Sequence, residues 1–373
     1  MIETSEFYDA LRRGGIDLFV GVPDSLLSSL CAYIDDNSTE KEHIITANEG
    51  NAVAVAAGYH LSSGRYAAVY MQNSGLGNTI NPLTSLTDPE VYRIPMLLII
   101  GWRGEPGVKD EPQHVKQGRI TCGQLDLLEI PYQIVDADSN AEEVVSKALQ
   151  TLSERNAPVA LVVRKDAFTP YKSKRKLATG ATLSREDALR CILELARDAL
   201  VVSTTGKTSR EVFELRVARN EPQRDFLTVG SMGHTSSIAL GVALGNPARR
   251  VVCLDGDGSL LMHMGALPVI GSRRPVNLVH VLLNNAAHES VGGQPTVAGN
   301  VDFEAIARAS GYVHYAKART IDELKQAWAD LGRLNEGPSL LEVMVSVGSR
   351  PDLGRPTSTP EENKQAFIEA ARA

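Results

Sequence analysis

The stretch that decides the fold runs from residue 251 to residue 296 and reads VVCLDGDGSLLMHMGALPVIGSRRPVNLVHVLLNNAAHESVGGQPT. An apolar run at 251–254 ends in DGDGS (255–259) and passes into a helical pattern, which is typical of a buried strand, a turn and a helix. A second apolar run, 276–283, ends in the pair Asn284 and Asn285. Two buried strands joined through a helix predict a parallel sheet, and both polar ends then lie at its carboxyl edge.

These polar ends suit an anion and a small cation. Gly256 and Gly258 let a bulky anion approach the backbone, and the helix that begins near Ser259 presents unpaired N–H groups to a phosphate. Asp257 and Asn285 offer the hard oxygen ligands that Mg²⁺ prefers. The segment therefore predicts a site for a phosphate group and Mg²⁺.

The same alternation of apolar runs and helical patterns continues along the chain, and it predicts an α/β protein with two doubly wound parallel-sheet domains. We expect a first domain at 1–168, a linker at 169–183 and a second domain at 184–373, with a helix capped by Ser184 opening the second. Helical patterns in the first half include 24–34, 49–61 and 141–153. The expected strands are 17–21, 43–46, 66–71, 96–101, 132–135, 159–163, 199–203, 226–229, 250–255, 276–284, 312–315 and 339–345.

Composition narrows the functional classes. The 373 residues carry a formal net charge of −7, which argues against a nucleic-acid partner. No apolar run reaches the length of a membrane span, and the first residues lack the basic and then apolar order of a signal peptide. The four cysteines are scattered and form no CxxC pair. We expect a soluble cytoplasmic protein with no membrane partner.

The 251–296 segment resembles the motif of thiamine-diphosphate enzymes, in which GDG is followed by roughly two dozen residues and then NN. Here 25 residues separate Gly258 from Asn284. The resemblance implies thiamine diphosphate as cofactor, with Mg²⁺ held by Asp257, Asn285 and the backbone carbonyl of Ala287. Family members usually carry Gly at the last position, and a carbonyl ligand tolerates Ala.

Two further loops fit this resemblance, because each follows an expected strand. In 203–207 (STTGK), Thr205 and Gly206 are implied to hold the diphosphate. In 230–233 (GSMG), Gly230 is implied to accept the 4′-amino group of the cofactor, and Met232 to support its bent shape. Taken alone, each loop is only a glycine-containing turn.

The first half supplies a candidate for the acid that activates the cofactor. Thiamine diphosphate becomes nucleophilic when C2 loses a proton, which requires a carboxyl group at N1′ in apolar surroundings. Glu49 lies in TANEGNAVAVAAG (46–58), between an expected strand and an Ala-rich helix, and the segment resembles the pyrimidine-binding pattern of the family. Stabilisation of the helix dipole is the alternative role for Glu49. The family resemblance further implies a homo-oligomer with active sites between subunits.

Several segments resemble phosphonopyruvate decarboxylases in particular, with sulfopyruvate decarboxylases close behind. They are GVPDS (21–25), QNSGLGN (72–78), DEPQH (110–114), HESVGGQPT (288–296) and RPDLGRP (350–356). The resemblance implies a small anionic 2-oxo acid as substrate and places His288 and Glu289 close to it. Asp24 and His114 are candidate proton donors, with N-capping by Asp24 and a surface position for His114 as the alternatives.

A second anion on the substrate calls for cations or hydrogen-bond donors. We expect Ser25, Arg350 and Arg355 to bind the substrate, since the guanidinium fork matches two phosphonate oxygens. Lys207 and Arg103 are further candidates for this role, and an ordinary solvated side chain is the alternative for each.

Three functions remain open at this point. The protein is a decarboxylase that releases an aldehyde, a carboligase that passes the same intermediate to a second carbonyl compound, or a binding module that keeps the fold without turnover. Glu49 argues against the third, because a non-catalytic protein has no need of an acid at that position.

Overall fold

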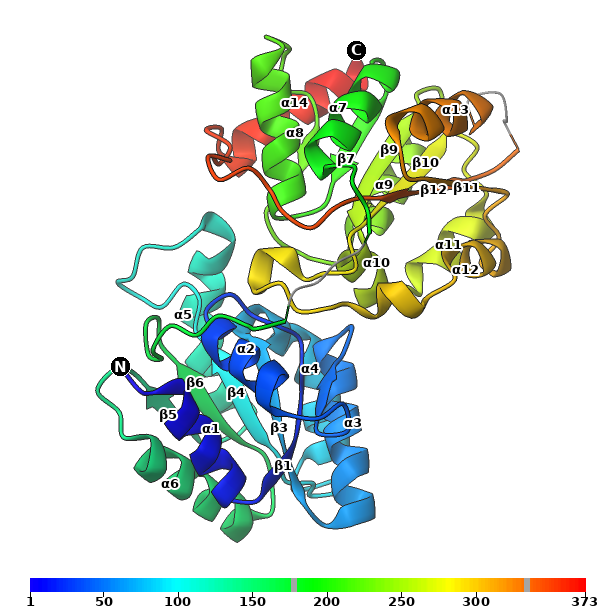
Figure 1. Ribbon diagram of the computed structural model, residues 1–373. Coiled ribbons are helices and arrows are strands. Elements are labelled where there is room, and N and C mark those ends of the chain that lie inside the picture. The colour runs from blue at the N-terminus through cyan, green and yellow to red at the C-terminus, as the bar shows by residue number, and fades with distance from the viewer. Residues whose placement is uncertain (176–179, 332–335) are drawn as a thin grey trace. The chain divides into compact units, whose positions relative to one another are not determined.

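The computed structural model describes residues 1–175, 180–331 and 336–373 (Figure 1). The chain divides into two compact units, the first formed by Met1–Lys176 with Ser290–Gln294 and the second by Leu177–Glu289 with Pro295–Ala373. The predicted linker, 169–183, spans this division, and its residues 176–179 lie outside the described residues.

The first unit is a six-stranded parallel sheet in the order β2-β1-β3-β4-β6-β5. Its strands are β1 (Ile16–Gly21), β2 (His43–Ile45), β3 (Tyr66–Gln72), β4 (Leu97–Gly101), β5 (Tyr132–Val135) and β6 (Val159–Val163). Its α-helices are α1 (Thr4–Arg13), α2 (Ser28–Asn37), α3 (Glu49–Ser63), α4 (Leu76–Pro82), α5 (Pro112–Leu127) and α6 (Ala141–Arg155).

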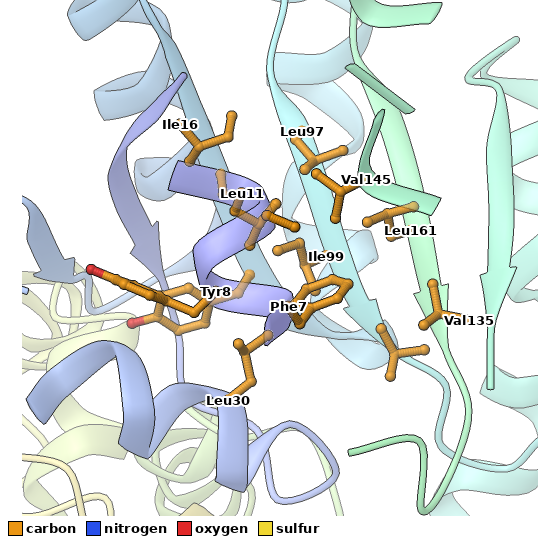
Figure 2. Packing of buried hydrophobic residues seen from close by; sticks show 14 of the residues in the cluster. Phe7, Tyr8, Leu11, Ile16, Leu30, Leu97, Ile99, Val135, Val145 and Leu161 are labelled. Carbon is orange, nitrogen blue, oxygen red and sulfur yellow. The ribbon is translucent and has the colours of Figure 1, made fainter. Parts of the chain in front are cut away.

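Two hydrophobic cores form because side chains alternate between the faces of the sheet. On β3, Tyr70 packs in one core, while Val69 and Met71 pack in the other. Helices α1, α2 and α6 cover the first core, where Phe7 and Leu11 of α1 meet strand residues such as Leu97, Ile99 and Leu161 (Figure 2). Helix α3 covers the second core with small residues, among them Ala52 and Ala56.

The second unit repeats this architecture with a six-stranded parallel sheet in the order β11-β12-β10-β9-β7-β8. Its strands are β7 (Leu200–Ser203), β8 (Phe226–Leu227), β9 (Val251–Gly256), β10 (Leu278–Asn284), β11 (His314–Ala318) and β12 (Ser339–Met344). Its α-helices are α7 (Arg185–Leu195), α8 (Lys207–Ala218), α9 (Thr235–Gly245), α10 (Asp257–Met262), α11 (Ala266–Arg273), α12 (Phe303–Ala309), α13 (Ile321–Leu331) and α14 (Pro360–Arg372).

The two sheets have the same strand order when each is numbered from its own first strand, which reads 2-1-3-4-6-5 in both. In this order the chain changes direction between the first and third strands, so β1 and β3 in one unit, and β7 and β9 in the other, flank the point where α/β proteins bind ligands. The predicted fold class is confirmed, and the expected strands begin within two residues of the observed ones.

One predicted helix begins later in the chain than the sequence pattern indicates. The pattern at 24–34 predicts a helix from residue 24, but α2 begins at Ser28 because the Asp24 carboxylate holds the backbone N–H groups of Leu26 and Leu27 in a turn. Of the helices in the described residues, none combines the length and apolarity needed to cross a membrane.

Candidate active site

Glu49 is the first residue of α3 and is 5% exposed. Its Oε2 accepts a hydrogen bond from the Asn78 amide at 2.7 Å, while Oε1 lies against the backbone of Gly75, where any added Cβ would approach it to 2.5 Å. Burial raises the pKa of the Glu49 carboxyl, and the Asn78 hydrogen bond opposes this only in part. The absence of a side chain at Gly75 leaves room for the Glu49 carboxyl, and burial lets this carboxyl keep its proton to higher pH.

Asp24 follows β1 and is fully buried beside the end of β3. Gln72 donates to its Oδ1 at 2.6 Å, and a Cβ on Gly101 would lie 2.2 Å from its Oδ2. Burial raises the pKa of Asp24, while the hydrogen bonds from Gln72 and from the turn lower it by less. Asp24 therefore holds the turn that precedes α2 and does not cap the helix itself, whose N-cap residue is Leu27. It is also an acid held in its protonated form to higher pH.

Arg103 connects the other candidates of the first unit. Its guanidinium forms a bidentate ion pair with Asp110, and its Nη1 donates a hydrogen bond to Ser25 Oγ at 2.7 Å. His114 lies near Arg103; burial lowers the pKa of its ring, with Arg103 adding to the effect, and its buried Nδ1 has no hydrogen-bond partner among the residues that the structure describes. Asp24, Ser25 and His114 thus gather around a cation that the sequence offered only as a further candidate.

Asp257 begins α10 in the second unit and is 3% exposed. Its carboxylate accepts hydrogen bonds from the Thr296 hydroxyl and the Asn285 backbone N–H, but burial raises its pKa to about 6. Within the described residues no Lys or Arg forms an ion pair with it. A buried carboxylate that lacks a cationic side chain and adjoins Asn285 fits a magnesium ligand.

Asn285 directly follows β10, and its amide is fixed at both ends. Its Oδ1 accepts the backbone N–H of Ala287 at 3.1 Å, and its Nδ2 donates to Glu289 Oε2 at 2.9 Å. An amide oxygen has two lone pairs, so Oδ1 retains one for a metal. Asp257, Asn285 and the backbone of Ala287 therefore remain a consistent set of oxygen ligands for Mg²⁺.

Glu289 is surrounded by cations. Arg185 donates to its Oε2 at 2.6 Å, and Lys207 Nζ lies 2.8 Å from its Oε1. Burial alone would raise the pKa of Glu289, but Arg185 and Lys207 outweigh burial and lower it. The sequence predicts that Glu289 is a catalytic group near the substrate. In the structure its carboxylate accepts hydrogen bonds from three side chains, those of Arg185, Lys207 and Asn285. This arrangement suits an orienting role better than proton donation.

His288 is buried next to the glycine turn. Burial lowers the pKa of its ring to about 4, so it is neutral near pH 7 and brings no positive charge to an anionic ligand. Its ring, together with Met232 Cε, approaches Gly258 so closely that a Cβ there would meet both at 3.2–3.3 Å. Gly258, Met232 and His288 are thus neighbours.

The two predicted cofactor loops, 203–207 and 230–233, lie together at this edge. The Thr205 hydroxyl donates to the carbonyl of Val229, next to Gly230, at 2.8 Å, and the N–H of Gly233 donates to Ser259 Oγ at 3.2 Å. Gly206 has φ +85°, a left-handed conformation that favours glycine, directly before α8. The geometry brings both loops to the glycine turn after β9.

The first acid of the DGDG turn has a different role from Asp257. Asp255 is fully buried, accepts the N–H of Gly256 at 3.0 Å and pairs with His280 at 3.3 Å, while His280 contacts the Tyr312 hydroxyl at 3.0 Å. These contacts occupy Asp255 inside the core, so Asp257 is the carboxylate that remains for a ligand.

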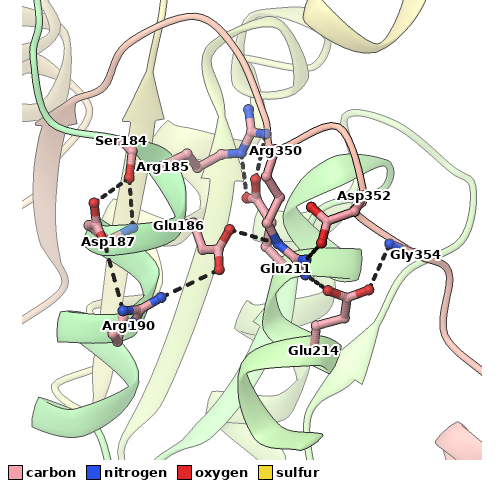
Figure 3. A network of polar contacts seen from close by, with 10 residues as sticks. All are labelled: Ser184, Arg185, Glu186, Asp187, Arg190, Glu211, Glu214, Arg350, Asp352 and Gly354. Atoms are coloured by element: carbon pink, nitrogen blue, oxygen red, sulfur yellow. Dashed lines mark hydrogen bonds and ion pairs between the residues drawn. The ribbon is translucent and has the colours of Figure 1, made fainter. Parts of the chain in front are cut away.

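The expectation that Arg350 binds substrate is not supported by its surroundings. Its guanidinium forms ion pairs with Glu186 at 3.1 Å, with Asp352 at 3.0 Å and with Glu214 (Figure 3). A dianionic substrate would have to displace three carboxylates, so Arg350 fastens its segment to α7 and α8 instead. Arg355 is exposed on the same segment.

Some residues of the site were not assigned a role from the sequence. Gln72 and Asn78 stand at the two ends of the QNSGLGN segment, so that segment was itself the available signal. Arg185 and Thr296 reach their partners over 104 and 39 residues of sequence, and no local pattern marks such distant contacts.

Both halves of the chain match models of known protein families. Residues 4–126 match the N-terminal TPP binding domain of thiamine pyrophosphate enzymes, and residues 204–343 match their C-terminal TPP binding domain. Glu49 and Asp24 fall in the first match, and Asp257, Asn285 and Glu289 in the second.

Similarity to individual proteins extends over nearly the whole chain. A phosphonopyruvate decarboxylase of Streptomyces viridochromogenes is 38% identical, with 98% of this chain and 94% of that protein covered. One from Streptomyces hygroscopicus is also 38% identical, with 100% and 94% covered. A sulfopyruvate decarboxylase of Methanosarcina acetivorans is 29% identical, with 97% and 95% covered. The chain therefore belongs to the family of thiamine-pyrophosphate decarboxylases that includes the phosphonopyruvate decarboxylases.

Proposed function

We propose that this protein converts phosphonopyruvate to phosphonoacetaldehyde and CO₂, with thiamine diphosphate and Mg²⁺ as cofactors. The observation that carries the proposal is the 38% identity to two phosphonopyruvate decarboxylases, which extends over 98–100% of this chain. In the reaction the bond between the carboxyl and keto carbons breaks, CO₂ leaves, and a proton takes its place. Because the product keeps its carbon–phosphorus bond, we assign the enzyme to phosphonate biosynthesis in the cytoplasm.

The residues that would hold the cofactors lie at the carboxyl edges of both sheets. Bound thiamine diphosphate supplies the electron sink that decarboxylation of a 2-oxo acid needs. Asp257, Asn285 and the carbonyl of Ala287 would hold Mg²⁺. The loops with Thr205, Gly206, Gly256, Gly258 and Ser259 would hold the diphosphate end. Gly230 would accept the 4′-amino group, and Met232 would support the bent shape of the cofactor.

The carboxyls of the first unit handle protons. Asn78 donates to Glu49 Oε2, which leaves Oε1 to carry the acid proton. The raised pKa of this buried acid favours its protonated form, which activation of the aminopyrimidine requires. Asp24, also with a raised pKa, and His114 are our candidates for supplying the proton that replaces CO₂.

The second anion of the substrate is assigned to Arg103 and Ser25. Asp110 orients the Arg103 guanidinium through Nε and Nη2, and Nη1, which contacts Ser25, still has a second N–H to offer. The Ser25 hydroxyl accepts from Arg103 and retains its own proton to donate. Together they present two converging donors, a suitable arrangement for one face of a phosphonate.

Product analysis with phosphonopyruvate, sulfopyruvate and pyruvate tests the assignment. We expect phosphonoacetaldehyde as the main product and a kcat/KM for phosphonopyruvate far above that for pyruvate. Arg103→Gln should remove about 2–5 kcal/mol of transition-state stabilisation for phosphonopyruvate, which lowers its kcat/KM. The kcat/KM for pyruvate should change little. Arg350→Gln is the matched control and should preserve the ratio between the two substrates.

Three results would count against this assignment. Equal efficiency on pyruvate would refute a second-anion site, and an acyloin product would identify a carboligase. A preference for sulfopyruvate would favour the alternative function, which the 29% identity to a sulfopyruvate decarboxylase over 97% of the chain supports.

We also propose that the protein is a homo-oligomer whose active sites are shared between subunits, as the family resemblance implies. The presumed activating acid, Glu49, belongs to one unit, and the presumed metal ligands belong to the other.

A further inference from the structure

Glu289 lies at the centre of a buried charge network in the second unit. Arg185, 6% exposed, donates to Glu289 through Nη1 and to Glu211, 1% exposed, through Nε and Nη2. Figure 3 shows Arg185 at the start of α7 and its contact with Glu211 on α8. Lys207, the first residue of α8, takes the other oxygen of Glu289 at 2.8 Å. The first residues of two helices, Arg185 of α7 and Lys207 of α8, therefore hold the Glu289 carboxylate in place.

Glu289 also accepts a hydrogen bond from Asn285, which we propose as a metal ligand. Glu289 Oε2 accepts from Asn285 Nδ2 at 2.9 Å, and the N–H of Ala287 donates to Asn285 Oδ1 at 3.1 Å. The two ends of an amide have nearly the same shape, and only the oxygen binds a cation. An anion beside Nδ2 makes one of the two orientations favourable, because the flipped amide would set its oxygen against a carboxylate.

We propose that Glu289, held by Arg185 and Lys207, is a positioning residue that sets the orientation of the Asn285 amide for Mg²⁺. This inference rests on the proposed cofactor and Mg²⁺, but it concerns metal binding and can be tested without any substrate. It also gives Lys207 and Arg185 a role that does not involve the substrate: they hold the Glu289 carboxylate in place.

The test is a calorimetric titration of the full-length protein with Mg²⁺ at saturating thiamine diphosphate. Glu289→Gln brings an uncharged amide next to Asn285, and we expect Mg²⁺ affinity to fall about 10- to 100-fold, the range for outer partners of metal ligands. Glu289→Asp keeps the charge but shortens the side chain by one methylene, and it should give a similar loss. The Asp variant also serves if the Gln variant fails to fold.

Glu211→Gln provides the matched control. Glu211 binds the same arginine but has no contact with Asn285, so its replacement should change Mg²⁺ affinity by less than about threefold. A loss equal to that of Glu289→Gln would mean that the whole network supports the loop without orienting the amide, and would overturn the proposal.

Asn285→Asp gives a readout that a purely structural role would not change. A carboxylate has oxygen at both positions, so its orientation no longer matters, and Glu289 becomes a like-charged neighbour. In this background Glu289→Gln should leave Mg²⁺ affinity unchanged or raise it, opposite in direction to its effect in the wild type. The same loss in both backgrounds would contradict the proposal.

Discussion

The acid–base behaviour of Glu49 follows from the residues around it. Helix α3 opens with Glu49 and continues through the buried residues Ala52, Val53 and Ala56, which bring no charge to the carboxyl. Asn78 is its one side-chain hydrogen-bond partner among the described residues. Desolvation therefore dominates and raises the pKa of the Glu49 carboxyl, and the hydrogen bond from Asn78 offsets this rise only in part.

Replacing Glu49 with Gln is expected to leave cofactor binding nearly intact while slowing exchange of the C2 proton of bound thiamine diphosphate by orders of magnitude. The amide keeps the size of the side chain and its contact with Asn78 but has no acid proton. NMR-monitored deuterium exchange measures this rate, and Glu49→Asp is the comparison that retains an acid. If exchange in the Gln variant matches the wild type, another residue activates the cofactor.

The raised pKa of Glu49 also has a consequence for stability. Folding favours the protonated form, so the stabilisation linked to that proton is complete below the unfolded pKa and is lost as pH rises through the folded pKa. Relative to Glu49→Gln, the cofactor-free wild type should lose free energy of unfolding across that window, by about 1.4 kcal/mol for each unit separating the two pKa values. Urea unfolding at a series of pH values checks this; a constant difference would argue against the raised pKa.

At the scale of single elements, the first residues of α7 both cap the helix and contact two other parts of the second unit. Ser184 caps the helix through the N–H of Asp187 at 3.0 Å, as predicted from the sequence. The next two residues contact different partners. Arg185 binds Glu211 and Glu186 binds Arg350 (Figure 3), and Arg185 also binds Glu289. One helix start therefore supports both the presumed metal loop and the segment that follows β12.

Ser184→Ala is expected to cost about 1 kcal/mol in free energy of unfolding, because it leaves an N–H of the first turn without its partner. Chemical denaturation monitored by circular dichroism measures the change. Ser146→Ala, at an exposed interior position of α6, is the control and should be neutral or slightly stabilising, since Ala has the higher helix propensity. If both substitutions change the free energy of unfolding equally, Ser184 does not stabilise α7 by capping it.

Elements were more predictable than contacts between them. Strands such as β9 and β10 are continuous apolar runs with polar ends, so their positions and the edge they share follow from local patterns. The same reasoning placed Asp257 beside Asn285, since both directly follow strands. It did not anticipate the surroundings of Arg350, because two of the three carboxylates that pair with it lie on α7 and α8, more than a hundred residues earlier in the chain.

At the scale of the whole molecule, the proposed sharing of active sites predicts complementation. Glu49→Ala and Asp257→Ala should each be inactive as pure oligomers, because one lacks the activating acid and the other the metal ligand. In a mixed oligomer some sites receive both wild-type residues, so co-expression should restore part of the activity. Differently tagged subunits verify mixing; verified mixing without activity would mean that each chain builds its own site.

The shared strand order of the two sheets bears on the ancestry of the chain. Two units with the order 2-1-3-4-6-5 are what tandem duplication of one ancestral gene would leave, even though the sequence shows no repeat. After such an event each copy is free to specialise. By our proposal the first copy carries the proton-handling carboxyls and the second the oxygen ligands, each on its own hydrophobic cores. Mutations that alter substrate choice can then accumulate in one copy while the other conserves its anion and metal chemistry.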